Sequence, residues 1–226
     1  MNFFTKIAKT IKSLPKYFWV LAFLTAAFQF ATYYLPRILH SQNLTVLSSK
    51  ADDAIPFIPG FAYIYIGAFL FWVFSFGYIY AKNKPIAYRL FTADCLCKIV
   101  CAICFCLYPC TMMQPDVSEI HGFGAWLLRI VYDADEPTQL LPSMHCYMSL
   151  LVAYPMFSKR AQPVSLGLKL FTVIFALLIC ASTLLVKQHV IADVLTGAAL
   201  ALVGWFSSLG IWKLIDLRRQ NNSSIT

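Results

Sequence analysis

The stretch LKLFTVIFALLICASTLLVKQHVIADVLTGAALALVGWFSSLGIW (residues 168–212) decides the fold, because it joins two long apolar runs through a few polar residues. An α-helix needs about 20 apolar residues to cross a bilayer, and each run is close to that length. The whole 226-residue chain is 60% hydrophobic and only 12% charged. Soluble domains carry roughly twice that charged fraction, so we expect the excess apolar surface to face lipid.

Similar apolar runs occur along the rest of the chain and predict six membrane helices in total. They cover residues 17–35, 61–80, 91–110, 143–157, 168–186 and 189–212. The fourth run is the shortest. The sequence therefore predicts an all-α fold, a polytopic membrane helical bundle with six transmembrane helices.

The two ends of the chain differ from this membrane region. Apolar residues between Phe3 and Leu14 fall on one helical face and lysines on the other, which is typical of a helix lying in the membrane interface. A signal peptide is the alternative, but the first run is too long and lacks a small-residue cleavage pattern. We thus predict an interfacial amphipathic helix over 1–16, a six-helix membrane domain over 17–214 and a disordered cytoplasmic tail over 215–226.

The distribution of lysine and arginine predicts the orientation. With the N-terminus inside, thirteen of these residues fall in inner segments and four in outer ones. The inner ones are Lys6, Lys9, Lys12, Lys16, Lys82, Lys84, Arg89, Lys159, Arg160, Lys169, Lys213, Arg218 and Arg219, and the outer ones are Arg37, Lys50, Arg129 and Lys187. Because positive charge favours the cytoplasmic side, both termini should be cytoplasmic. The loops before the fourth and sixth runs then face outward, and the first of these also has apolar residues from Phe123 to Val131 at helical spacing.

His189 and Asp193 form the first candidate site. Their i, i+4 spacing places them on one helix face, where the carboxylate can fix the histidine tautomer. The other ring nitrogen is then available as a nucleophile or base. Ionisable residues in an apolar segment are costly and usually functional. The alternative is a structural histidine–aspartate bond beside a snorkelling Lys187.

His145 is the second candidate, in the stretch LPSMH (141–145). Proline favours the first turn of a helix, and the free N–H groups of such a turn attract anions. Ser143 adds a hydroxyl and His145 an acid–base group, a combination that suits a phosphate. The alternative is an interfacial histidine beside an ordinary helix cap. The predicted orientation places His145 and His189 at similar depth on the outer side, which favours one shared site.

The stretch PSMH (142–145), and Ser182-Thr183 followed by His189 and Asp193, resemble two motifs of the type 2 phosphatidic acid phosphatase (PAP2) superfamily. Those motifs are Pro-Ser-Gly-His and Ser-Arg-x5-His-x3-Asp. This superfamily also includes the vanadium haloperoxidases. The resemblance covers nearly the whole chain, because the six-span layout is similar as well.

The departures concern the cations that the superfamily uses to bind phosphate oxygens. Its first motif, Lys-x6-Arg-Pro, meets Leu107 and Gln114-Pro115 here, and Thr183 stands where the third motif has arginine. Lys187 is the natural substitute, with Arg129 and Lys98 as weaker candidates. The implied phosphate ligands are Ser143, Lys187, Ser182 and Thr183. Similar departures occur in the branch that resembles inositolphosphotransferases and sphingomyelin synthases. The form of the third motif found here looks most similar to that branch and its bacterial relatives.

The resemblance implies a mechanism in which His189 attacks phosphorus, Asp193 orients His189, and His145 protonates the leaving alkoxide. No metal and no other cofactor are expected. The lead prediction is a lipid phosphatase acting on phosphatidic acid or an isoprenyl diphosphate. The alternatives are a lipid phosphotransferase and a non-catalytic membrane protein or transporter. The expected partners are a lipid phosphate substrate and membrane lipids, without nucleic acid, at a bacterial cytoplasmic membrane with the active site facing outward.

Overall fold

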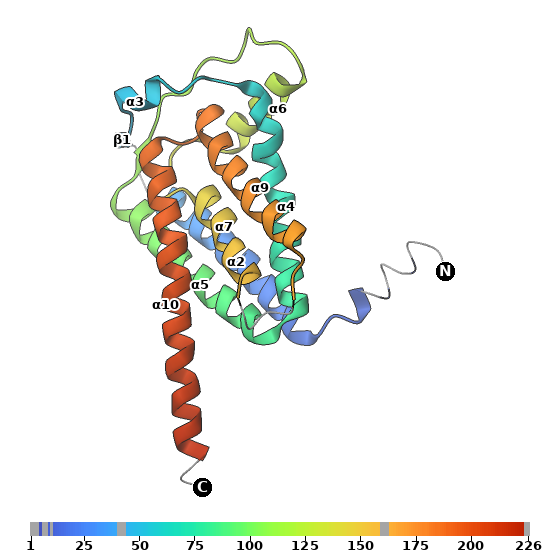
Figure 1. The fold of residues 1–226 in the computed structure, drawn as a ribbon. Coiled ribbons are helices and arrows are strands. Elements are labelled where there is room, and N and C mark those ends of the chain that lie inside the picture. Colours follow the sequence, from blue (N-terminus) through green and yellow to red (C-terminus); the bar gives the residue numbers. More distant parts are fainter. Residues whose placement is uncertain (1–4, 6–8, 10, 40–43, 159–162, 224–226) are drawn as a thin grey trace.

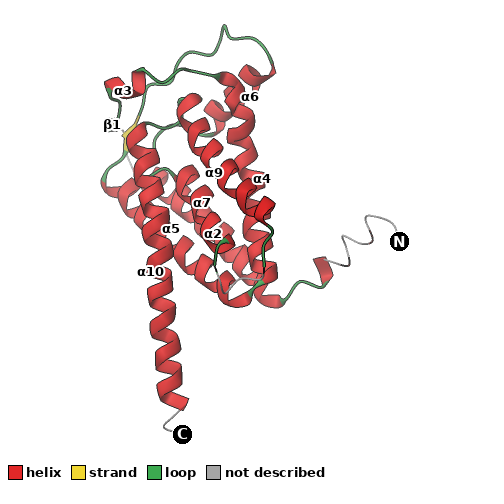
Figure 2. Ribbon diagram, in the orientation of Figure 1, coloured by secondary structure: helices red, strands yellow, loops and turns green. Residues whose placement is uncertain are grey.

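Helices make up nearly all of the ordered structure in the computed structural model, which describes residues 5, 9, 11–39, 44–158 and 163–223 (Figure 1). The long helices are α2 (Lys16–Leu39), α4 (Ala62–Lys82), α5 (Lys84–Leu107), α9 (Leu166–Leu185) and α10 (Ile191–Ser223). The shorter elements are β1 (Thr45–Val46), α3 (Lys50–Asp53), η1 (Pro59–Phe61), β2 (Cys110–Thr111), α6 (Phe123–Ala134), α7 (Met144–Leu151) and α8 (Ala153–Met156). The predicted all-α bundle is confirmed (Figure 2).

Five helices of the described chain are long and apolar enough to cross a membrane. They are α2, α4 with the η1 turn before it, α5, α9 and α10. They coincide with five of the six predicted spans and are apolar over much of the surface that they leave exposed, as on α4 at Val73 and on α9 at Ile174. That surface is suited to lipid, as expected from the composition.

The fourth predicted span, 143–157, folds as two short helices, α7 and α8, and neither reaches membrane-spanning length. Seven of the eight α7 residues are buried, because α7 packs against α4, α5, α9 and α10. A helix enclosed by protein needs no long lipid-facing surface, which explains why this segment is short. The count of six spans stays a prediction.

The start of α2 and the end of α10 lie at one end of the bundle, and α3 and α6 lie at the other (Figure 1). Helix α10 continues to Ser223, through most of the segment where we expected a disordered tail from residue 215. One contact in this part of α10 is the ion pair between Asp216 and Arg89, at 3.8 Å. The interfacial helix predicted over 1–16 lies largely outside the described residues.

The α3 and α6 end of the bundle is covered by connected loops. The helix predicted between Phe123 and Val131 is confirmed as α6, whose buried residues Ala125 and Leu128 face the bundle while Trp126 is exposed. Strands β1 and β2 pair in parallel and join the first of these loops to the second. Tyr132 of α6 also donates a hydrogen bond to Val186 O, at 2.7 Å. The strand pairing and this hydrogen bond fix the loops over the ends of α7, α9 and α10.

Close packing of α10 on the start of α7 brings the two motif regions together. A Cβ on Gly197 would lie 2.6 Å from Ser143 O and 3.1 Å from Cys146 Cβ. Any larger side chain at position 197 would therefore push the helices apart. The glycine allows the approach that sets His145 beside His189.

Candidate active site

The turn between α9 and α10 holds His189 in place. The backbone N–H groups of Gln188 and His189 both donate to Thr183 O, at 2.9 and 3.1 Å, which satisfies a carbonyl at the end of α9. Lys187 has a φ of 52°, a left-handed conformation that reverses the chain. At the start of α10, Ile191 N donates to the carboxylate of Asp52, at 2.7 Å. His189 is thus fixed outside both helices, at the loop-covered end of the bundle.

Asp193 orients His189. Its Oδ2 lies 3.2 Å from His189 Nδ1 and accepts a hydrogen bond from Val190 N, at 3.0 Å. Burial disfavours the charged imidazole, but the hydrogen bond and the charge of Asp193 outweigh it and raise the pKa of His189 above 6.5. With Nδ1 facing the carboxylate, Nε2 is the nitrogen available to a substrate.

The start of α7 brings His145 to the same place. Ser143 caps this helix, because its Oγ accepts from Cys146 N, at 3.3 Å. The backbone N–H of Ser143 donates to Asp193 O, at 3.1 Å, so α7 and α10 are joined beside the site. The ring centroids of His145 and His189 are 5.9 Å apart. The two histidines predicted to share a site therefore do lie together.

Aromatic side chains of α4 surround the His145 ring. Tyr65 stacks on it at 4.3 Å between ring centroids, and Trp72 and Phe69 lie at 5.1 and 6.0 Å. His145 Nε2 is buried and has no hydrogen-bond partner among the described residues. Packing fixes the ring, while one nitrogen is left for a ligand.

His189 lines two cavities. The loop cavity, of about 640 Å³, lies under the segments around Asp52 and Gln114. The aromatic cavity, of about 500 Å³, lies between α2 and α4 and also contains His145. The aromatic cavity is lined by Gln29, Phe30, Tyr33, Tyr34, Phe69, Trp72, Val73, Ala134, Asp135, Glu136, Pro137, Gln139, Leu140, Met144, His145, Gln188 and His189. Among the described residues its lining includes no lysine or arginine, whereas the loop cavity is lined by Lys187.

Two donors face the loop cavity. Lys187 Nζ donates to Asp52 O and Ile55 O, at 2.8 and 2.7 Å, which anchors the loop and leaves a third N–H. Gln114 Nε2 is buried without a partner in the described part of the chain. The sequence analysis noted Gln114 only as a departure from the motif arginine. Its place directly before Pro115, where the first motif has arginine, was the signal that could have marked Gln114 as a candidate donor.

The other candidate cations are engaged elsewhere. Arg129 donates to three backbone carbonyls, of Val117, Ser118 and Ile120, and so shapes the second outer loop. Lys98 is buried in α5, where it pairs with Asp94. Neither side chain lines the two cavities beside His189.

Ser182 and Thr183 also differ from the role that the resemblance implies. Their hydroxyls donate back to their own helix, to Ile179 O and Cys180 O, at 2.7 and 2.8 Å. Neither residue lines the loop or aromatic cavity. Thr183 instead acts through its carbonyl, which holds His189 N. In this geometry both residues position the turn rather than donate to a bound phosphate.

The assembled site contains an oriented imidazole, a second histidine with an unpartnered nitrogen, and donors on one side. This arrangement is suited to covalent transfer of a phosphoryl group. Comparison with protein families agrees: a family model described as the PAP2 superfamily matches residues 31–207. No curated protein and no solved structure matches the chain.

Proposed function

Because the chain belongs to the PAP2 superfamily, we propose that it hydrolyses a phosphate ester of a lipid, such as phosphatidic acid or an isoprenyl diphosphate. Membership supports a phosphatase-type phosphoesterase, and the apolar helices make the chain an integral membrane protein. The observation that carries the lipid assignment is the position of His189, which lines both the loop cavity, with its donors Lys187 and Gln114 beside Asp52 and Asp53, and the more apolar aromatic cavity. A phosphate and a hydrocarbon chain then have separate places on its two sides.

The loop cavity is the proposed place of the phosphate. Lys187 and Gln114 provide N–H donors there, and a lysine ammonium attracts phosphate as a point charge. This cavity lies among the loops that the charge distribution predicts to lie on the outer side of the membrane. The proposed site therefore faces outward, with both termini in the cytoplasm.

The aromatic cavity is the proposed place of the lipid. Phe30 of α2 and Phe69 and Val73 of α4 line it and are also strongly exposed on the membrane-facing surface of the bundle. A lipid could thus enter sideways from the bilayer, and its ester oxygen would reach the histidines from the side of His145. Apolar lining with a few placed polar groups is typical of pockets for small molecules.

The proposed chemistry has two steps. His189 Nε2 attacks phosphorus, the bond from phosphorus to the lipid oxygen breaks, and His145 gives its proton to the departing alkoxide. His145 then takes a proton from water, the water oxygen bonds to phosphorus, and the bond to His189 breaks to release phosphate. Asp193 stabilises the imidazolium character of His189 throughout. Acid–base help of this kind is worth about 10²–10⁴ in rate.

The test uses the purified full-length protein in detergent with a panel of phosphorylated lipids. We expect release of free phosphate from at least one lipid phosphate. With ³²P-labelled substrate, rapid acid-free quenching should trap an acid-labile, base-stable phosphoprotein that His189→Ala lacks. Absence of both phosphate release and phosphoprotein across the panel would favour the non-catalytic alternative.

A further inference from the structure

Helix α6 leaves an apolar face uncovered at the loop-covered end of the bundle. Phe123, Trp126 and Ile130 lie at positions i, i+3 and i+7 on that face, and each residue is between 43% and 59% exposed. The rings of Phe123 and Trp126 stack, with 5.1 Å between their centroids. We call these three side chains the α6 patch. A contiguous exposed apolar surface marks a site of interaction, and the proposed phosphatase chemistry does not use this one.

The opposite face of α6 holds the helix firmly against the bundle. Leu128 and Val131 are buried there in one apolar cluster with Tyr65 of α4. A Cβ on Gly124 would lie 3.2 Å from the Cα of Gly60, so the glycine lets α6 lie directly on the η1 turn before α4. The α6 patch is therefore presented in one orientation, which lowers the entropy cost of docking.

The α6 patch continues the membrane-facing surface of α4. Tyr63, Leu70 and Phe74 lie at positions i, i+7 and i+11 of α4, which places them on one stripe, and all three are exposed. At the end of this stripe, the centroid of the Tyr63 ring lies 5.6 Å from that of Phe123. Figure 1 shows α6 at the same end of α4. A lipid layer that covers the α4 stripe therefore also reaches the α6 patch.

The residue types at this junction are those of a membrane–water interface. Tryptophan and tyrosine favour the interface because each combines an apolar ring with one polar group, and Trp126 and Tyr63 both lie here. Arg129 of α6 is engaged by carbonyl oxygens of the loop before the helix. A second protein on the α6 patch would have to displace lipid from the adjoining α4 stripe. Lipid is therefore the occupant that the surface favours.

The residue that follows α6, Asp135, joins this helix to the candidate active site. Tyr65 of α4 donates to Asp135 Oδ2, at 2.8 Å, and Tyr33 of α2 donates to the other carboxylate oxygen. Gln188 Nε2, beside His189, donates to Asp135 O, at 3.2 Å. Asp135 also lines the aromatic cavity. The end of α6 is thus bonded to α2, to α4 and to the turn that holds His189.

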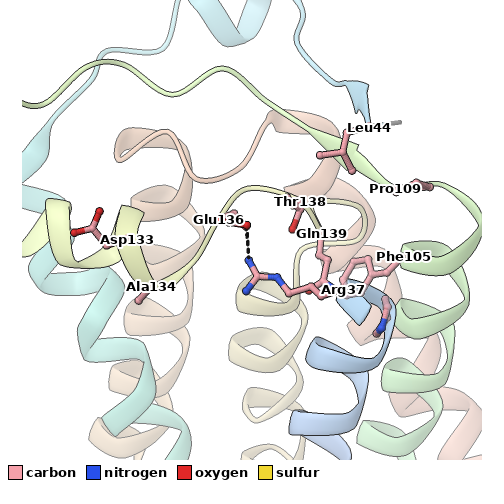
Figure 3. A pocket seen from close by; sticks show the side chains of 10 residues that line it. Arg37, Leu44, Phe105, Pro109, Asp133, Ala134, Glu136, Thr138 and Gln139 are labelled. Carbon is pink, nitrogen blue, oxygen red and sulfur yellow. Dashed lines mark hydrogen bonds and ion pairs between the residues drawn. The ribbon is translucent and has the colours of Figure 1, made fainter. Parts of the chain in front are cut away.

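The next residues extend these connections along the end of α2. Arg37 Nη2 donates to Glu136 O, at 3.1 Å, and Gln139 Nε2 donates to Tyr33 O, at 2.8 Å. Figure 3 shows the end of α6 at Asp133 and the segment that leads from it past Arg37 to Gln139. Glu136 and Gln139 also line the aromatic cavity. The position of α6 therefore sets one wall of that cavity.

We propose that α6 docks into the outer leaflet of the surrounding membrane, with the α6 patch among the headgroups and the adjoining parts of the acyl chains. The leaflet follows from the predicted orientation, in which the loops on both sides of α6 face outward. In this position α6 holds the entrance of the aromatic cavity at the depth of the lipid phosphates. The docking itself does not depend on the reaction, whereas its effect on lipid entry rests on the proposed function.

Quenching of tryptophan fluorescence by brominated lipids tests the docking. The full-length protein is placed in phosphatidylcholine bilayers whose acyl chains carry bromine either near the headgroup or near the chain end. The difference between the wild type and Trp126→Phe gives the contribution of Trp126. We expect Trp126 to be quenched more strongly by bromine near the headgroup, because an interfacial helix is buried only about 5–10 Å deep.

Two further tryptophans, each introduced into the Trp126→Phe protein, calibrate the depth. Leu70→Trp lies about 10 Å further along α4 than Tyr63 and should be quenched more strongly by bromine near the chain end. Glu119→Trp lies at an exposed, charged position of the loop before α6 and should be quenched by neither lipid. If Trp126 is quenched no more than Glu119→Trp, or has the depth profile of Leu70→Trp, the docking is overturned.

A charge placed in the α6 patch tests the effect on lipid entry. Ile130→Glu should lower kcat/KM for long-chain phosphatidic acid within a bilayer by about 3- to 10-fold, because a charge is unfavourable among acyl chains. Hydrolysis of dihexanoyl phosphatidic acid from solution should be unchanged, since this substrate does not enter from the bilayer. Leu217→Glu, the same change at an exposed leucine near the end of α10, is the matched control and should affect neither substrate.

The outcomes separate this inference from the proposed function. Equal loss of both activities in Ile130→Glu would show general damage to the site and would overturn the role of α6 in lipid entry. If the wild type hydrolyses neither substrate, the proposed function fails and the role in lipid entry fails with it. The fluorescence result then still decides whether α6 docks into the membrane.

Discussion

Two ionisable pairs with the same i, i+4 spacing are buried in this bundle, and they differ in how completely they are partnered. Lys98 Nζ lies 2.6 Å from Asp94 Oδ2 in α5, and both side chains are 0% exposed. His189 Nδ1 lies 3.2 Å from Asp193 Oδ2, and the His189 side chain is 8% exposed. The i, i+4 spacing is the same for both pairs, so the sequence alone does not show which pair is fully partnered.

The surroundings do separate them. Lys98 also donates to Thr25 O, and Asp94 Oδ1 accepts from Tyr147, so this pair ties α2, α5 and α7 together. In contrast, Asp193 Oδ1 has no partner among the described residues, and His189 lines two cavities. A buried pair with complete partners holds helices together, whereas a buried pair beside a cavity and with free bonding capacity can react.

The largest effect is expected for His189→Ala. This variant removes the proposed nucleophile, so lipid phosphate hydrolysis should fall at least by the ~10²–10⁴ that acid–base catalysis alone supplies, and in practice below detection. Its melting temperature in detergent should stay close to that of the wild type, because the ring borders cavities rather than filling the core. Phosphate release at more than a hundredth of the wild-type rate would remove His189 from the mechanism and with it the contrast between the pairs.

Asp193→Asn should have the next largest effect and should also change the pH dependence. Removing the orienting carboxylate of a histidine–aspartate pair costs up to ~10⁴ in rate in serine proteases. His189 must be neutral to attack, and its pKa is raised above 6.5, so wild-type kcat/KM should fall as the pH drops through that raised value. Without the Asp193 charge, burial dominates and lowers the pKa of His189, which shifts the acid limb to lower pH. A pH profile of kcat/KM for both proteins measures this, and an acid limb that stays in place would show that His189 does not titrate in the reaction.

The sequence predicted which of the candidate residues lie together better than it predicted their hydrogen-bond partners. His145, His189 and Asp193 followed from helical spacing and motif order, and the structure brings them together because Gly197 lets α10 approach α7. Hydrogen-bond partners from distant segments could not be predicted in this way. Lys187 is bound by carbonyls of the 52–55 loop, about 130 positions away in the chain, and the Ser182 and Thr183 hydroxyls bond within their own helix.

Prediction of the helices was limited in the same way as prediction of the hydrogen-bond partners. Long apolar runs predicted five helices well, because crossing a bilayer imposes both length and composition on each helix. The 143–157 segment is short because other helices enclose α7, which is a tertiary property without a signal in hydropathy. The tail beyond residue 215 is polar, yet it continues α10, where Asp216 pairs with Arg89.

Lys98→Met tests the fully partnered pair of the comparison, Lys98 and Asp94. It leaves Asp94 buried without its cation, and breaking a buried pair in this way typically costs about 3–5 kcal/mol of stability. Thermal unfolding in detergent should show this loss, while the folded fraction should keep its kcat. The double variant Asp94→Leu/Lys98→Met, which removes both charges, should regain much of the stability. A variant that is stable but inactive would instead place Lys98 in the reaction.

The smallest effect is expected for Lys187→Met. Gln114→Leu is its companion variant, which removes the uncharged donor of the same cavity. If the third N–H of Lys187 binds phosphate, its loss should lower kcat/KM about 10- to 100-fold, because a charge-assisted hydrogen bond is lost. Gln114→Leu removes an uncharged donor and should lower kcat/KM only about 2- to 10-fold. Limited proteolysis of the 46–57 loop separates a phosphate-binding role of Lys187 from a role in anchoring the loop alone. Faster cleavage with kcat/KM unchanged would make Lys187 an anchor and leave Gln114 and the helix α7 N-terminus as the phosphate donors. Gln114→Arg would then restore the superfamily's cation and should tighten phosphate binding, which inhibition by inorganic phosphate can measure.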